Sequence, residues 1–178
     1  MTRVDYIIVG QGLAGSALAI ALLNRGKSLL VIDRDDPDAA SRVAAGLVTT
    51  LAGKGMNPGW RQAEYLPYAL EYYRELEVTC GQQLFFPHPV LRLFSDANES
   101  KKFERKFEVI QDWVAQNEPD IACDQILGGF GGFEMADSGR LDTLKYLSVV
   151  RERIQADAYF CDTSFDVGQV EFQGSEGH

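Results

Sequence analysis

The 178-residue chain has 46% hydrophobic and 24% charged residues, a composition that excludes disordered, collagen-like and low-complexity proteins. Its 17 Lys and Arg against 26 Asp and Glu give a formal net charge of -9, which argues against binding to nucleic acid. The sequence has no apolar run near the ~20 residues of a membrane span. Its three cysteines, Cys80, Cys123 and Cys161, are widely spaced, which argues against a disulfide framework or a metal site. We expect a cytoplasmic protein.

The first predicted elements have the order strand, helix, strand. Residues 4–9 form an apolar run rich in β-branched side chains, typical of a strand covered on both faces of a parallel sheet. Residues 16–25 indicate a helix, which Gly26 ends. Residues 28–32 predict a second buried strand that ends at Asp33. This order is typical of an α/β fold with a parallel sheet.

A glycine-rich fingerprint lies between the first strand and the helix. The segment 10–15 has the form G-x-G-x-x-G, and an acidic residue follows it at about the 20-residue spacing that dinucleotide-binding loops show. Gly10 permits the tight turn, Gly12 lets the backbone approach a pyrophosphate, and Gly15 lets the helix pack closely on the strand. The alternative is that the glycines only form a tight turn between a strand and a helix. The spacing of the acidic residue favours the dinucleotide site.

The residues around the fingerprint predict how the nucleotide is held. Leu13 and Ala14 open the helix, where unpaired N–H groups and the positive end of the dipole favour a pyrophosphate. We expect Asp33 to accept hydrogen bonds from the adenosine ribose hydroxyls. A carboxylate there repels a 2′-phosphate, which argues against NADP, and Arg34 weakens that argument without reversing it. The fingerprint alone does not distinguish NAD from FAD.

The segment 33–47 resembles the flavin loop of the D-amino-acid oxidase-like FAD oxidoreductases, the group of glycine oxidase and sarcosine oxidase. In that group a stretch of small residues follows the second strand and runs beneath the isoalloxazine. The resemblance implies contacts of Ala40 and Ser41 with the pyrophosphate or ribityl region. It also implies that Ala45, Gly46 and Leu47 lie near the flavin ring. Taken alone, residues 39–47 equally fit the start of a short helix.

The same resemblance predicts how the flavin is attached. Members with covalent flavin use a His or a Cys, and neither occurs between Asp33 and Trp60. We therefore expect non-covalent FAD.

The remainder of the chain predicts a second region of mixed α and β structure. Apolar residues at helical spacing follow the connector 52–59, and we interpret the aromatic residues along this helix as core rather than as a substrate cage. They are Trp60, Tyr65, Tyr68, Tyr72 and Tyr73. Residues 83–87 and 90–94 predict short strands, and Asp96 with Glu99 forms a D-x-x-E capping box at the start of another helix.

The expected fold class is α/β: a Rossmann-like, three-layer FAD-binding domain interrupted by a mixed α+β substrate domain. We assign residues 1–80 to the first part of the FAD-binding domain and 81–138 to the substrate domain. A helix and a strand near 158–161 then return the chain, through 139–178, to the FAD-binding domain. The resemblance covers only the N-terminal half of the family, so we expect an incomplete form of the fold.

The function implied by the resemblance is FAD-dependent oxidation of an amine or amino acid by hydride transfer to flavin N5. The partner would be a small-molecule substrate, and no catalytic side chain is assigned because the flavin supplies the chemistry. One alternative is a non-enzymatic module that binds NAD or ADP-ribose. Another is a half-domain whose fold a partner chain or a second copy completes.

Overall fold

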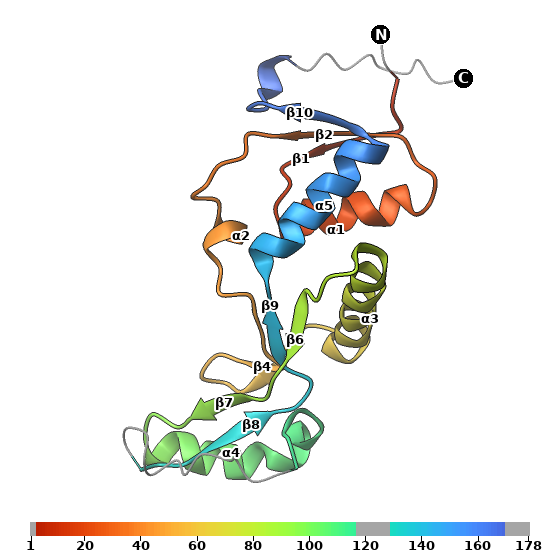
Figure 1. The fold of residues 1–178 in the computed structure, drawn as a ribbon. Helices are drawn as coiled ribbons and strands as arrows, with labels where there is room; N and C mark the ends of the chain where they lie inside the picture. Colours follow the sequence, from red (N-terminus) through yellow and green to blue (C-terminus); the bar gives the residue numbers. More distant parts are fainter. Residues whose placement is uncertain (1–2, 117–128, 170–178) are drawn as a thin grey trace, which may run out of the picture. The chain divides into compact units, whose positions relative to one another are not determined.

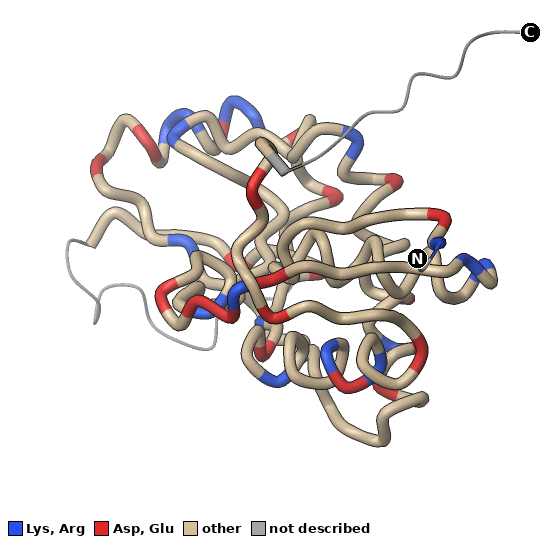
Figure 2. Tube along the Cα trace, turned by 90° about the horizontal axis from the view of Figure 1, so that it is seen from above, with Lys and Arg blue, Asp and Glu red and all other residues tan. Residues whose placement is uncertain are grey.

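The computed structural model describes residues 3–116 and 129–169 and divides the chain into two compact units (Figure 1). The first unit combines Met1–Ala44 with Thr143–His178, and the second is Ala45–Asp142. Within the described residues no helix is long and apolar enough to cross a membrane. Figure 2 shows acidic and basic residues interspersed along the chain rather than gathered into one basic stretch.

The first unit is built on a three-stranded parallel sheet of order β1-β2-β10. Its elements are β1 (Tyr6–Val9), α1 (Leu13–Leu23), β2 (Leu29–Asp33), α2 (Ala40–Val43), α5 (Thr143–Asp157), β10 (Tyr159–Asp162) and the 3-10 helix η3 (Val167–Gln169). Val31 of β2 pairs with Ile8 on one side and with Phe160 on the other. The last strand therefore joins the first two although more than half of the chain separates them, which is the return that the sequence predicts.

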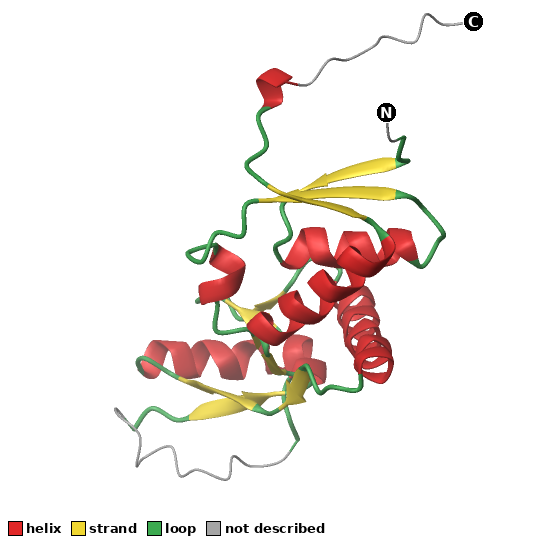
Figure 3. Ribbon diagram, turned by 45° about the horizontal axis from the view of Figure 1, so that its top comes forward, coloured by secondary structure: helices red, strands yellow, loops and turns green. Residues whose placement is uncertain are grey.

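Helices α1 and α5 cover one face of this sheet (Figure 3). Ile8 and Val31 point toward them and are buried, as are Val150 and Ile154 of α5. The opposite face is open in the described part of the chain, because side chains alternate along a strand and Ile7 is 58% exposed. The expectation that residues 4–9 are covered on both faces is therefore wrong within the described residues. The α/β class with a parallel sheet is confirmed.

The described residues of the second unit form three small antiparallel sheets, of order β3-β9-β6, β4-β5 and β7-β8. Its strands are β3 (Leu47–Val48), β4 (Leu51–Ala52), β5 (Asn57–Pro58), β6 (Phe85–Pro87), β7 (Val90–Leu93), β8 (Gly132–Met135) and β9 (Gly139–Leu141). Its helices are α3 (Gln62–Cys80), α4 (Ala97–Ile110) and the 3-10 helix η1 (Gln111–Trp113). A core formed by Leu51, Met56, Phe94, Ile110, Phe133 and Met135 joins α4 to these strands.

Helix α3 corrects one interpretation of the sequence. Trp60, Tyr65 and Tyr68 are 79%, 43% and 69% exposed, so these aromatic residues are not core, whereas Tyr72 and Tyr73 are half-buried. Helical spacing predicted one apolar face, but the buried positions of α3 are Leu66 and Leu76. Trp60 precedes the helix, and Tyr65 and Tyr68 lie outside this stripe. Tyr73 adjoins it, because it follows Leu66 by seven residues and stacks on Phe85.

The boundaries between the two compact units lie at residues 44/45 and 142/143. The functional division into an FAD-binding domain (1–80 and 139–178) and a substrate domain (81–138) stays a prediction, because it concerns what each part binds.

Candidate dinucleotide site

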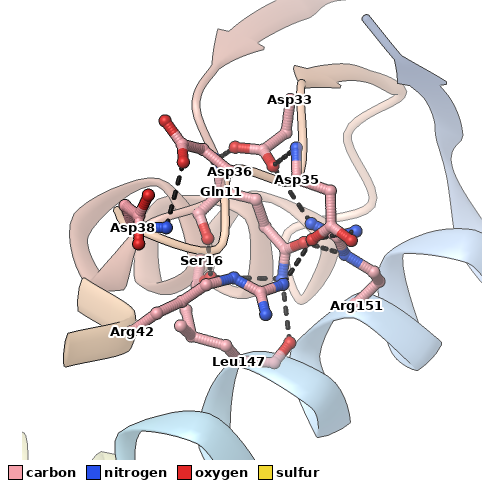
Figure 4. Close-up of polar contacts among 9 residues, drawn as sticks. All are labelled: Gln11, Ser16, Asp33, Asp35, Asp36, Asp38, Arg42, Leu147 and Arg151. Atoms are coloured by element: carbon pink, nitrogen blue, oxygen red, sulfur yellow. Dashed lines mark hydrogen bonds and ion pairs between the residues drawn. The ribbon is translucent and has the colours of Figure 1, made fainter. Parts of the chain in front are cut away.

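A pocket of about 170 Å³ lies in the first unit, where the glycine loop, the end of β2 and helix α5 meet. Figure 4 shows the polar side chains around it. The lining residues are Gln11, Gly12, Asp33, Arg34, Asp36, Ala39, Ser41, Arg42, Leu147 and Arg151. The pocket thus brings together residues from the two ends of the chain and combines carboxylates with guanidinium groups.

The geometry of the glycine loop explains why glycine occupies its positions. Gly10 has a φ of +90°, a conformation that side chains with a Cβ rarely adopt. A Cβ at Gly15 would lie 1.9 Å from the carbonyl oxygen of Gly10, and one at Gly12 would lie 2.8 Å from Oγ of Ser41. A side chain at Gly15 would therefore prevent close packing of α1 on the loop, and one at Gly12 would fill the cradle beside the Ser41 hydroxyl.

The start of α1 provides donors for an anion. Gly12 is the N-cap of this eleven-residue helix and offers no side-chain oxygen to the N–H groups of the first turn. The N–H of Leu13 donates to Oγ of Ser41 at 3.1 Å, so a hydroxyl group lies directly beside the helix N-terminus. Backbone N–H groups, a hydroxyl and the positive end of the helix dipole together favour a phosphate group.

The carboxylate of Asp33 is held by three donors at the end of β2. Its Oδ2 accepts from the N–H of Gln11 at 2.7 Å, and its Oδ1 accepts from the N–H of Asp35 at 2.8 Å and from Nη2 of Arg151 at 3.1 Å. Burial opposes ionisation of this carboxyl, but the hydrogen bonds and the guanidinium outweigh burial and lower the pKa of Asp33 below its usual value. The group is therefore an ionised acceptor near neutral pH.

Arg151 of α5 lies at the centre of the charged groups, and sequence reasoning missed it. Its Nε donates to Oε1 of Gln11 at 2.5 Å, and its Nη1 lies 2.9 Å from Oδ1 of Asp35. Arg42 pairs with the same Asp35 carboxylate. A signal was present in the sequence: Arg151 follows the apolar face of its helix, one turn after Leu147, where a charge needs a partner.

The other predicted site residues have different surroundings. Arg34 lines the pocket but is 66% exposed and pairs with Asp36 at 2.5 Å. Ala40 begins the short helix α2 and is exposed, and Leu13 and Ala14 form the first turn of α1. None of these three residues lines the pocket.

The predicted flavin-ring residues belong to the second compact unit. Ala45 is exposed, and Gly46 has a φ of +71° and accepts at its carbonyl oxygen from the N–H of Leu141 at 2.8 Å. Leu47 pairs with Arg140 and is 62% exposed. The assignment of Ala45, Gly46 and Leu47 to the flavin ring stays a prediction.

The cysteines and possible metal ligands do not form a second site in the described part of the chain. Cys80 and Cys161 are free thiols, and Cys123 lies outside the described residues. Among residues 3–116 and 129–169, no group of three or more His, Cys, Asp or Glu side chains is placed to hold a metal ion.

The parallel sheet, the glycine loop and the acidic end of β2 define a dinucleotide-binding α/β protein. Residues 5–160 match the family model of DAO, the FAD dependent oxidoreductases. The chain belongs to this family, whose cofactor is FAD. The cradle at Gly12, the N-terminus of α1 and the ionised Asp33 fit the ADP half of that cofactor.

Individual relatives agree with the family match. The chain is 27% identical over 168 residues to the bifunctional protein ThiO/ThiG of Synechocystis, covering 87% of this chain and 24% of that protein. Two solved structures show the same fold: glycine oxidase from Bacillus cereus (TM-score 0.67, 16% identity) and iminodiacetate oxidase from Chelativorans (TM-score 0.66, 21% identity). The matches cover 89% and 88% of this chain and 46% of each structure. The chain therefore spans about half the length of these structures and about a quarter of that curated relative.

Proposed function

We propose that this chain binds the ADP half of a non-covalent FAD and is part of an enzyme that oxidises an amine or an amino acid. The observation that carries the proposal is the glycine cradle at the N-terminus of α1 with the ionised Asp33 beside it. The family match supports FAD over NAD or ADP-ribose. The names of the two solved structures, a glycine oxidase and an iminodiacetate oxidase, support a small amine or amino-acid substrate.

Each group in the pocket has a role in binding. The donors at the start of α1 and the Ser41 hydroxyl hold the pyrophosphate, and Asp33 accepts from the ribose. When bound, FAD would supply the redox chemistry as the hydride acceptor, so no side chain of this chain is assigned as a catalytic residue. Ala45, Gly46 and Leu47 remain the segment proposed for contact with the flavin ring, with Ala40 beside the pyrophosphate or ribityl region. A cytoplasmic location is part of the proposal and depends on the sequence alone.

The first unit has an exposed apolar sheet face on which a partner chain or a second copy could pack. Ile7 and Val9 of β1, which lies at the edge of the sheet in the described part of the chain, face its open side and are 58% and 53% exposed. Unpaired strand edges and apolar sheet faces associate with other chains when nothing covers them. We propose that further sheet-forming segments, from a partner or a second copy, cover this face. Light scattering tests the idea: a chain that stays a clean monomer at high concentration contradicts it.

An absorption spectrum tests FAD binding directly. The purified chain is incubated with excess FAD and desalted, and we expect the flavin bands to remain with the protein. The Gly12→Val variant should lose them, since its Cβ meets Ser41 and its branches fill the cradle. Leu18→Ala is the control in the same unit, because Leu18 lies on α1, is 51% exposed and does not line the pocket. A wild-type chain that keeps no flavin and gains no thermal stability from FAD would contradict the proposal. Equal stabilisation by NAD or ADP-ribose would favour the non-enzymatic alternative.

A further inference from the structure

Arg151 connects α5 to the glycine loop and to the end of β2 through polar contacts. Each of its three nitrogen atoms contacts a different residue: Nε contacts Gln11, Nη1 contacts Asp35 and Nη2 contacts Asp33. Its guanidinium also lies over the ring of Phe160, 4.8 Å from the centroid. The side chain is 19% exposed, so the charge is largely removed from water and held by these partners.

Gln11 connects Arg151 to the glycine loop. The residue is 4% exposed, and its Nε2 donates to the carbonyl oxygen of Leu147 at 2.9 Å while its Oε1 accepts from Arg151. The side chain of Gln11 therefore bridges two positions of α5 one turn apart. Its backbone N–H donates to Asp33, which in turn accepts from Arg151. Gln11, Asp33 and Arg151 thus form a closed ring of hydrogen bonds (Figure 4).

This ring limits what the Asp33 carboxylate can do. A carboxylate has about four acceptor directions, and three donors already occupy three of them. Two of the three donors act on Oδ1, so the free direction lies on Oδ2. A carboxylate held in this way presents one acceptor in a fixed direction instead of rotating between several.

We propose that Arg151 is a positioning residue for the adenosine ribose: it orients Asp33 and holds the glycine loop against α5, so that one ribose hydroxyl is recognised. The inference rests on the proposed function for its nucleotide. It goes beyond that function because it assigns selectivity for a ribose hydroxyl to Arg151. This residue lies about 120 positions after Asp33, the carboxylate that it orients. Arg151 acts through Asp33 and Gln11 and needs no contact with the nucleotide.

Binding of ADP, 2′-deoxy-ADP and 3′-deoxy-ADP to the full chain tests the proposal by calorimetry. We expect the wild type to prefer ADP to one deoxy analogue by roughly 10-fold, the value of one hydrogen bond to a charged group. Arg151→Gln should bind ADP about 10-fold more weakly and lose most of that preference. Arg151→Lys keeps the charge but has a single ammonium, and it should recover part of the affinity. Arg153→Gln is the matched control, because Arg153 lies on the same helix, is 47% exposed and pairs only locally with Asp157.

A double variant separates positioning from a merely structural role. If Arg151 acts through Asp33, Arg151→Gln should weaken ADP binding little further once Asp33→Asn is present. Additive losses, or an Arg151→Gln or Arg151→Lys variant that keeps full affinity and full preference for ADP, would overturn the inference. If Arg151→Gln does not fold, Arg151→Lys and the deoxy preference decide the matter. If the wild type binds ADP with this preference, Arg151→Gln loses it and FAD does not bind, the role of Arg151 is supported and the proposed function is contradicted. A wild type that binds FAD but does not distinguish ADP from its deoxy analogues supports the proposed function and contradicts the role of Arg151. A wild type that binds neither ADP nor FAD contradicts both.

Discussion

Two largely buried arginine–carboxylate pairs, one in each compact unit, have similar exposure but different surroundings. Arg151 and Asp33 are both 19% exposed and lie 3.1 Å apart, whereas Arg92 and Glu99 are 16% and 13% exposed and lie 2.5 Å apart. Asp33 and Arg151 are 118 residues apart in the chain, and Glu99 and Arg92 are seven apart. The first pair lines a pocket, and the second joins β7 to the start of α4.

The acceptor atoms of the two carboxylates explain the difference. Oε1 of Glu99 accepts from Arg92, and its Oε2 accepts from both the N–H and the hydroxyl of Ser95, at 2.9 and 2.8 Å. All of its donors come from residues close in the sequence, so the group completes a helix start. Asp33 combines one local donor, Asp35, with donors from the glycine loop and from a distant helix, and it faces a pocket. Burial of an ion pair therefore does not indicate a binding site, whereas an ion pair assembled from distant segments at a pocket does.

The largest expected effect comes from breaking the loop that supports the Asp33 pair. Gly15→Ala would place a Cβ 1.9 Å from the Gly10 carbonyl oxygen, which is backbone and cannot move aside. We expect a loss of about 3 kcal/mol in the free energy of unfolding, measured with urea. Hydrogen exchange should show lost protection in β1 and α1 but not in β7 and β8. Leu18→Ala, at a position of α1 that is 51% exposed, is the control. Equal protection in Gly15→Ala and wild type would show that the loop packs differently.

Removal of the pocket carboxylate should act on binding. In Asp33→Ala the ribose loses its acceptor, and we expect FAD or ADP binding to weaken by about 1–3 kcal/mol in a titration. Glu99→Gln is the matched comparison, because it changes a carboxylate of similar exposure and should leave nucleotide affinity unchanged. Equal affinity in wild type and Asp33→Ala would place the ribose elsewhere.

Removal of the local carboxylate should act on stability. Glu99→Gln loses a charge-assisted contact with Arg92, which should cost about 1–2 kcal/mol in the free energy of unfolding. Donors from Ser95 and Arg92 lower the pKa of Glu99 to about 2, against an ordinary value of 4.5. Its stabilisation is thus complete above about pH 4.5 and is lost as the pH falls toward 2.

The pH dependence of the free energy of unfolding tests whether the stabilisation by Glu99 is lost as the pH falls. Wild-type stability should fall between about pH 4.5 and 2, and Glu99→Gln should show a shallower slope over the same interval. Identical slopes in the two proteins would mean that other carboxylates determine acid unfolding. Because Asp33 lies in the other unit, its substitution should not change the contribution of Glu99.

Much of the fold follows from local sequence patterns. Strands β1 and β2, helix α1 and the turn at Gly10 lie close to their predicted positions, because a β-branched run, a helical run and a glycine turn each depend on neighbouring residues. The capping box at Asp96 is also confirmed in part: its Oδ1 accepts from the N–H groups of Asn98 and Glu99, while Glu99 reaches back to Ser95 rather than to Asp96. The exposure of Trp60 and Tyr68 was beyond sequence reasoning, since helical spacing does not say how wide the buried stripe is.

The sequence by itself determined the nucleotide fingerprint, the parallel α/β class and the family resemblance, because these depend on residue type and spacing over some forty positions. Only the tertiary structure decided that Arg151 and the buried side chain of Gln11 complete the surroundings of Asp33. The physical reason is that their contacts form when α5 packs against α1 and β10, which brings Arg151 to the end of β2. Local patterns do not encode this long-range event. An arginine on a helix predicts a charge that needs a partner, and the folded chain determines which partner it finds.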